Sequence, residues 1–108
     1  MDQKKQMQLI ENGNFKDNNG SIMRIFNMIA HKYFKIKDIM YALPFVSEKD
    51  VIKSMDYLCD EGYLKCRTIL TKEPAAISDY SYDDLEAKLT AKGTRLLECA
   101  IDDPLVHL

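Results

Sequence analysis

The segment from Ser47 to Leu64, SEKDVIKSMDYLCDEGYL, limits the possible folds of this chain most strongly, because it marks both ends of one helix and the start of a strand. Ser47 suits the N-cap, and Asp50 lies three residues later, where a capping box places a second acceptor. Apolar residues repeat at helical spacing: Val51, Ile52, Met55 and Leu58. Gly62 suits the left-handed residue that ends a helix. We expect a helix over residues 48–61 that leads directly into a strand.

Two further helices are expected upstream. The first begins at Ser21, a suitable N-cap, and carries an apolar face formed by Ile22, Ile25, Phe26 and Ile29. The second runs from Ile36 to Leu43 and stops at Pro44, which has no N–H to donate and disfavours helical backbone in the preceding residue. Because the connection to the next helix is short and apolar, the second and third helices must pack closely, as in a helix-turn-helix unit.

The remaining segments predict a hairpin, a closing helix and an N-terminal arm. Strands are expected over residues 63–71 and 85–89, the latter from its alternation of apolar and charged residues. The long segment between them, residues 72–84, forms the hairpin loop, and Thr90 caps a last helix. Glycine, asparagine and aspartate are frequent over residues 13–20, which indicates a loop. We therefore expect an arm and loop over residues 1–20 and one domain over residues 21–108.

The order helix, helix, helix, strand, loop, strand, helix is that of a winged helix-turn-helix domain, a mainly α fold with a small β-hairpin. Residues 55–64, MDYLCDEGYL, resemble the end of the recognition helix in bacterial winged-helix regulators. Residues 88–98, KLTAKGTRLLE, resemble the start of their closing helix. The ending AKGTRLLECAIDDPLV is similar to the C-termini of small winged-helix proteins of Mu-like prophages. The resemblance implies a DNA-binding transcriptional regulator, encoded by a prophage and acting as a homodimer.

By position, the resemblance also implies which residues contact DNA. Helix 48–61 would enter the major groove with its outer face. That face would offer Ser47, Lys49, Lys53, Ser54 and Tyr57. Basic residues on and between the first two helices would hold phosphates and set the register: Arg24, Lys32, Lys35 and Lys37.

The charge distribution sets a condition on this interpretation and leaves an alternative open. The net charge of the chain is -2, and the local charge is +3 over residues 21–43 but -3 over residues 44–62. DNA affinity depends on phosphate neutralisation, so the DNA interpretation requires a homodimer that doubles the number of cations. The alternative is a protein-interaction module on the same fold that does not bind DNA. Its anchors would be Ile77, Tyr80 and Tyr82 in the hairpin loop.

No enzymatic activity, cofactor or metal is expected. The chain has two histidines and lacks the nucleophile, zinc-protease and phosphate-loop motifs. Its three cysteines are odd in number and form no C-x-x-C pair. No apolar run approaches the roughly 20 residues that span a bilayer, and the N-terminus does not resemble a signal peptide. We therefore expect a cytoplasmic protein.

Overall fold

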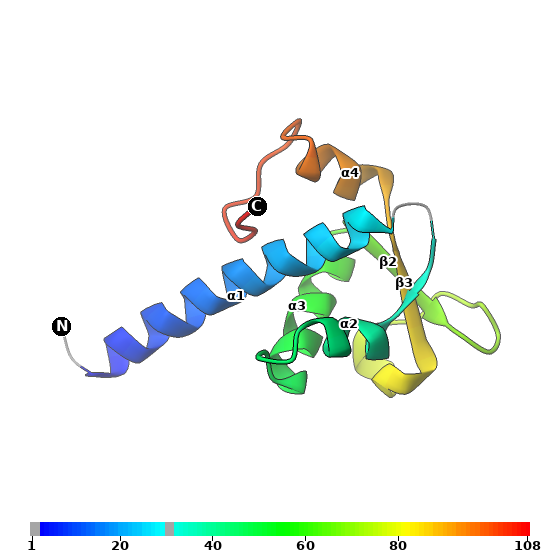
Figure 1. Ribbon diagram of the computed structural model, residues 1–108, viewed down its shortest axis with the longest axis horizontal. Coiled ribbons are helices and arrows are strands. Elements are labelled where there is room, and N and C mark those ends of the chain that lie inside the picture. The colour runs from blue at the N-terminus through cyan, green and yellow to red at the C-terminus, as the bar shows by residue number, and fades with distance from the viewer. Residues whose placement is uncertain (1–2, 30–31) are drawn as a thin grey trace.

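The computed structural model describes the backbone of residues 3–29 and 32–108, and the side chains of residues 14–29 and 32–108. Within these residues the fold is mixed α+β and mostly helical, with four α-helices and a three-stranded antiparallel sheet (Figure 1). The helices are α1 (Gln3–Met28), α2 (Ile36–Ala42), α3 (Glu48–Asp60) and α4 (Ala91–Leu97). The strands are β1 (Phe34–Lys35), β2 (Leu64–Thr68) and β3 (Leu85–Leu89).

The sheet has the order β1-β3-β2, and all of its pairings are antiparallel. The predicted strand over residues 85–89 is confirmed, whereas the strand that starts at Leu64 ends at Thr68, before the predicted Thr71. The prediction of a two-stranded hairpin is wrong, because β1 adds a third strand beside β3. Two residues are too few to show the alternation by which a strand is recognised in a sequence.

The core lies between the inner face of the sheet and the helices α1, α2 and α3. The inward residues of β2 and β3 pair across the ladder, as Leu64 with Leu89 and Cys66 with Ala87 do. Phe34 of β1 meets Phe26 of α1 edge to face, with ring centroids 6.3 Å apart. The largest buried apolar side chains come from every layer: Ile22, Met23, Phe26, Ile36, Ile39, Val51, Met55, Leu58, Leu64, Leu85 and Leu96.

The local signals of α3 and α4 are confirmed by their geometry. The Oγ of Ser47 accepts the N–H of Asp50 at 3.2 Å, so Ser47 caps α3. Gly62 has a φ of 82° and ends the turn that follows α3. This left-handed conformation is easily reached by glycine, which has no Cβ. The Oγ1 of Thr90 accepts the N–H of Gly93 at 3.0 Å and caps α4 as predicted.

Helix α1 corrects two predictions, because it runs without a break through the expected loop at residues 13–20 and through the expected N-cap at Ser21. Asn19 and Gly20 are buried under the C-terminal tail, residues 101–108. The Nδ2 of Asn19 donates to the carbonyl of Leu105 at 2.9 Å. A Cβ on Gly20 would collide with the carbonyl of His107. These tertiary contacts override the weak helix propensity of the segment. The N-terminal part of α1 projects from the body of the molecule (Figure 1).

A buried polar network fastens the tail to α3 and to Tyr63, which immediately precedes β2. The carboxylate of Asp103 accepts the hydroxyls of Tyr57 and Tyr63 at 2.7 and 2.8 Å and the N–H of Leu105 at 2.9 Å. Burial of Asp103 raises its pKa, but these hydrogen bonds outweigh burial and hold the pKa below its ordinary value. In turn, burial and the bond to Asp103 raise the pKa of both tyrosines.

Candidate nucleic-acid interface

The outer side of α3 carries a balanced set of charges. With about 3.6 residues per turn, the positions opposite the buried stripe are 49, 53, 56 and 60. The side chains there are Lys49, Lys53, Asp56 and Asp60, and both lysines are exposed. The two lysines are one turn apart, so both can reach the same ligand. The lysines lie toward the N-terminal half of the helix and the aspartates toward its C-terminal half, which separates the two signs along the face.

Three of the predicted α3 contacts are corrected by burial and bonding. The prediction that Ser54 lies on the outer face is wrong, because its side chain is 0% exposed and belongs to the same stripe as Val51 and Leu58. Tyr57 is half-buried, and its hydroxyl is committed to Asp103. Ser47 is exposed, but its Oγ is occupied by the cap. Lys49 and Lys53 are therefore the exposed cations that remain of the predicted α3 set.

Helix α1 forms one wall of a groove along α3, which the sequence did not reveal. The groove has a volume of about 210 Å³ and is lined by Asn14, Phe15 and Asn18 of α1 and by Lys49, Asp50 and Lys53 of α3. The Nζ of Lys53 lies 4.7 Å from the centroid of the Phe15 ring, a cation–π contact that orients the lysine. Sequence reasoning missed these α1 residues because it predicted a loop over residues 13–20. Their spacing of one and four positions would have placed them on one face of a helix.

The other predicted phosphate contacts lie in different surroundings. The guanidinium of Arg24 donates to the carbonyl of His107 at 3.2 Å and to the Oγ of Ser21 at 3.1 Å, so it holds the tail. Lys32 is exposed just before β1. Lys35 is on β1, and Lys37 lines a groove with residues of α2, Glu48 and Tyr82. The structure therefore does not gather these four cations into one surface with the outer face of α3.

The three predicted partner anchors differ in their exposure and in their bonding. Ile77 begins the short 3₁₀ helix η1 (Ile77–Asp79) and is 3% exposed, so its prediction as an accessible anchor is wrong. Its side chain belongs to the hydrophobic core. Tyr80 is 50% exposed and lines a groove of about 620 Å³ with Leu70. Tyr82, in η2 (Tyr82–Asp84), donates its hydroxyl to Glu48 at 3.0 Å, and this bond raises the pKa of Tyr82.

Similarity to known proteins gives no information on this interface. No family model, no curated protein and no solved structure matches the chain. Among the side chains that the structure describes, no group of three or more histidine, cysteine, aspartate or glutamate residues could hold a metal ion. Over the same described part of the chain, none of the helices has both the length and the apolar character needed to cross a membrane.

Proposed function

We propose that this chain is a small DNA-binding transcriptional regulator of the winged helix-turn-helix class, which reads DNA with α3 as a homodimer. The observation that carries the proposal is the pair Lys49 and Lys53, exposed one turn apart on the outer side of a capped helix. This helix follows α2 after a short connection and precedes the β2–β3 hairpin. The prophage origin implied by the resemblance and the cytoplasmic location expected from the sequence accompany this proposal.

The groove beside α3 supplies a contact set of suitable chemistry. Lysine binds phosphates and guanine edges, and asparagine pairs with the N6 and N7 groups of adenine. Asn14 and Asn18 place two amides beside the two lysines. In this account Ser54 and Tyr57 have structural roles, and the DNA contacts are Asn14, Asn18, Lys49 and Lys53. Asp50 repels phosphates, so we expect weak binding by one chain alone.

A homodimer would compensate for the small number of cations that one chain presents to DNA. Two copies double the number of lysines that neutralise phosphate, and paired recognition helices bind half-sites separated by about 34–36 Å. The projecting part of α1 is an element on which a second copy can pack (Figure 1). The proposal therefore assigns base and phosphate contact to the α1–α3 groove and assembly to the N-terminal part of α1.

The double variant Lys49→Gln with Lys53→Gln tests the role of α3. It removes two positive charges without disturbing a buried residue, so we expect lost duplex binding and an unchanged helical circular dichroism spectrum. A matched control is Asn27→Asp with Met28→Glu, which changes the net charge equally at exposed positions near the end of α1. The control should bind DNA as the wild type does. Wild-type binding by the α3 variant would show that α3 is not the reading element.

A second candidate function is a protein-interaction module that does not bind DNA. It is favoured by two fully or largely exposed aromatic side chains, Tyr41 and Phe45. They lie at the end of α2 and in the α2–α3 connection, and Tyr41 lines a groove of about 300 Å³ with Met40, Leu43, Pro44 and Val46. Exposed apolar groups that cluster in this way often mark partner surfaces. This function and the first are separated by whether the intact protein binds duplex DNA at low salt.

A further inference from the structure

The outer face of the sheet holds a concentration of positive charge that the α3 contacts do not use. In β2 the residues that point away from the core are Lys65 and Arg67, because Leu64, Cys66 and Thr68 are buried. In β3 they are Glu86 and Lys88, which pair with Arg67 and Lys65 across the ladder. Lys35 of β1 pairs with Glu86. The three strands thus present four basic side chains and one carboxylate on this face.

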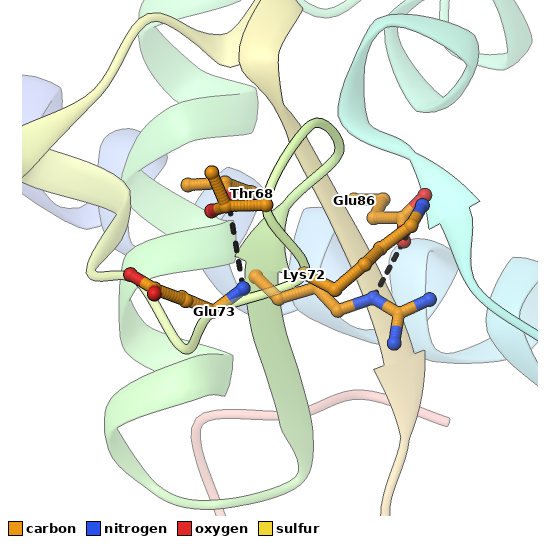
Figure 2. A network of polar contacts seen from close by, with 6 residues as sticks. Thr68, Lys72, Glu73 and Glu86 are labelled. Carbon is orange, nitrogen blue, oxygen red and sulfur yellow. Dashed lines mark hydrogen bonds and ion pairs between the residues drawn. The ribbon is translucent and has the colours of Figure 1, made fainter.

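The single carboxylate is already neutralised by other residues. The Nε of Arg67 lies 2.6 Å from Oε2 of Glu86, and the Nζ of Lys72 lies 3.3 Å from the same oxygen. Figure 2 shows the Lys72 side chain extending toward Glu86. Burial raises the pKa of Glu86, but these two partners outweigh burial and hold the pKa below its ordinary value. Glu86 is therefore ionised and forms ion pairs with Arg67 and Lys72. It does not neutralise Lys65 or Lys88.

Lys65 and Lys88 face each other directly in the antiparallel ladder. Like charges in this position destabilise a sheet. Among the side chains of residues 14–29 and 32–108, no carboxylate lies within 4.0 Å of either lysine. The Tyr33 ring lies 5.8 Å from the Nζ of Lys88 but is already covered by Arg67 at 3.4 Å. The pair is therefore an uncompensated repulsion in the isolated chain, which a bound anion would relieve.

A third cation completes a groove at this end of the sheet. The groove has a volume of about 550 Å³ and is lined by Lys65, Lys88, Arg95 and the residues that join β3 to α4. Arg95 is exposed on α4. We define the sheet groove by these three cations, Lys65, Lys88 and Arg95. The residues that line the sheet groove include these three cations and no carboxylate, which suits the phosphates of a polyanion.

We propose that the sheet groove binds the phosphate backbone of DNA as a second contact surface, separate from α3. The proposal rests on the proposed function, because it takes duplex DNA as the ligand. The sheet groove is lined by residues of β2, β3 and α4, whereas Lys49 and Lys53 of α3 line the α1–α3 groove, so the two sets of cations lie in separate grooves. The sheet groove would hold phosphates without regard to sequence, while α3 reads bases.

The test is binding of a fluorescent pool of random-sequence duplexes across a salt series. The variant Lys65→Gln with Lys88→Gln removes two phosphate contacts, so the slope of log affinity against log salt should become shallower by about two. The variant Lys65→Arg with Lys88→Arg keeps the charge and should keep the wild-type slope. Without DNA, the glutamine variant should melt at or above the wild-type temperature, because it removes the repulsion between the two lysines.

The outcomes separate this inference from the proposed function. If the Lys65→Gln, Lys88→Gln variant keeps the wild-type slope of log affinity against log salt, the proposal that the sheet groove binds phosphates is overturned. Lost binding by Lys49→Gln with Lys53→Gln would still support the role of α3. If the Lys49→Gln, Lys53→Gln variant binds as the wild type does while the Lys65→Gln, Lys88→Gln variant shows a shallower salt slope, the role of α3 in DNA binding is overturned and the role of the sheet groove is supported. A wild-type protein that binds no duplex even at low salt would overturn both.

Discussion

At the scale of single residues, Asp103 joins three parts of the molecule. The residue is 8% exposed, and its carboxylate accepts hydrogen bonds from Tyr57 of α3, from Tyr63 just before β2 and from the tail itself. Hydrogen bonds to a charged acceptor contribute roughly 1.5–3 kcal/mol each. The position of the tail therefore depends on this carboxylate being ionised.

The variant Asp103→Asn should lower the free energy of unfolding by about 2 kcal/mol at neutral pH. The folded-state pKa of Asp103 is lowered, so its stabilising contribution is present above the ordinary pKa of about 3.9. It is lost as the pH falls through the lowered pKa. Urea unfolding at a series of pH values should show the wild type and the variant converging in acid. A difference that does not change with pH would contradict the ionised network, and Asp102→Asn, at an exposed neighbour, is the control.

Residue-level patterns in the sequence were sufficient where the cause is local. The caps at Ser47 and Thr90 and the turn at Gly62 depend on side chains a few residues away, and the structure confirms all three. Ser54 and Ile77 were misplaced for a different reason. Ser54 is polar yet lies on the buried stripe of α3, and Ile77 is apolar yet was placed on an accessible loop. Polarity alone did not indicate which face each residue occupies.

At the scale of elements, α1 and the C-terminal tail stabilise each other. The His107 N–H donates to the carbonyl of Lys16 at 3.1 Å, and Nδ1 of His107 lies 2.9 Å from Asp17. These partners are about ninety positions apart in the chain. No local pattern could have shown that residues 13–20 are helical, because the contacts that favour the helix come from the opposite end of the sequence. The two-residue strand β1 was missed for a similar reason, since its pairing with β3 defines it.

The variant Gly20→Ala tests this contact by the sign of its effect. Alanine has a higher helix propensity than glycine, and an unhindered substitution should stabilise α1 by about 0.5–1 kcal/mol. The structure predicts the opposite, because the new Cβ collides with the His107 carbonyl. We expect a loss of about 1–3 kcal/mol in urea unfolding and faster hydrogen exchange in residues 101–108. A stabilised variant with a protected tail would show that the tail does not pack at Gly20.

At the scale of the whole molecule, the two charged surfaces are set by the layers of the fold. The sheet and the helices enclose one core, and side chains outside it form the α1–α3 groove and the sheet groove, which share no lining residue. The sequence predicted the lysines of α3 from their position in one helix. It did not predict the sheet groove, because Lys65, Lys88 and Arg95 come together only through strand register and the placement of α4.

The molecule is also longer than its core requires. Its principal extents are 49 × 32 × 21 Å, and α1 accounts for the long dimension by projecting from the body (Figure 1). In the proposed homodimer this projection packs on a second copy, which brings two α3 helices and two sheet grooves to one duplex or to neighbouring duplexes. In that proposal the doubling matters because one chain offers few exposed lysines on α3 to neutralise phosphates.

The most direct test of DNA binding is to titrate the intact wild-type protein with random-sequence duplex DNA across salt concentrations, with its mass measured by light scattering on the same sample. We expect a dimer whose affinity for duplex DNA falls steeply as the salt concentration rises, because each phosphate contact releases counterions. The contradicting result is the absence of binding at low salt, whatever the mass. That result would favour the interaction module and make Tyr41 and Phe45 the next residues to substitute.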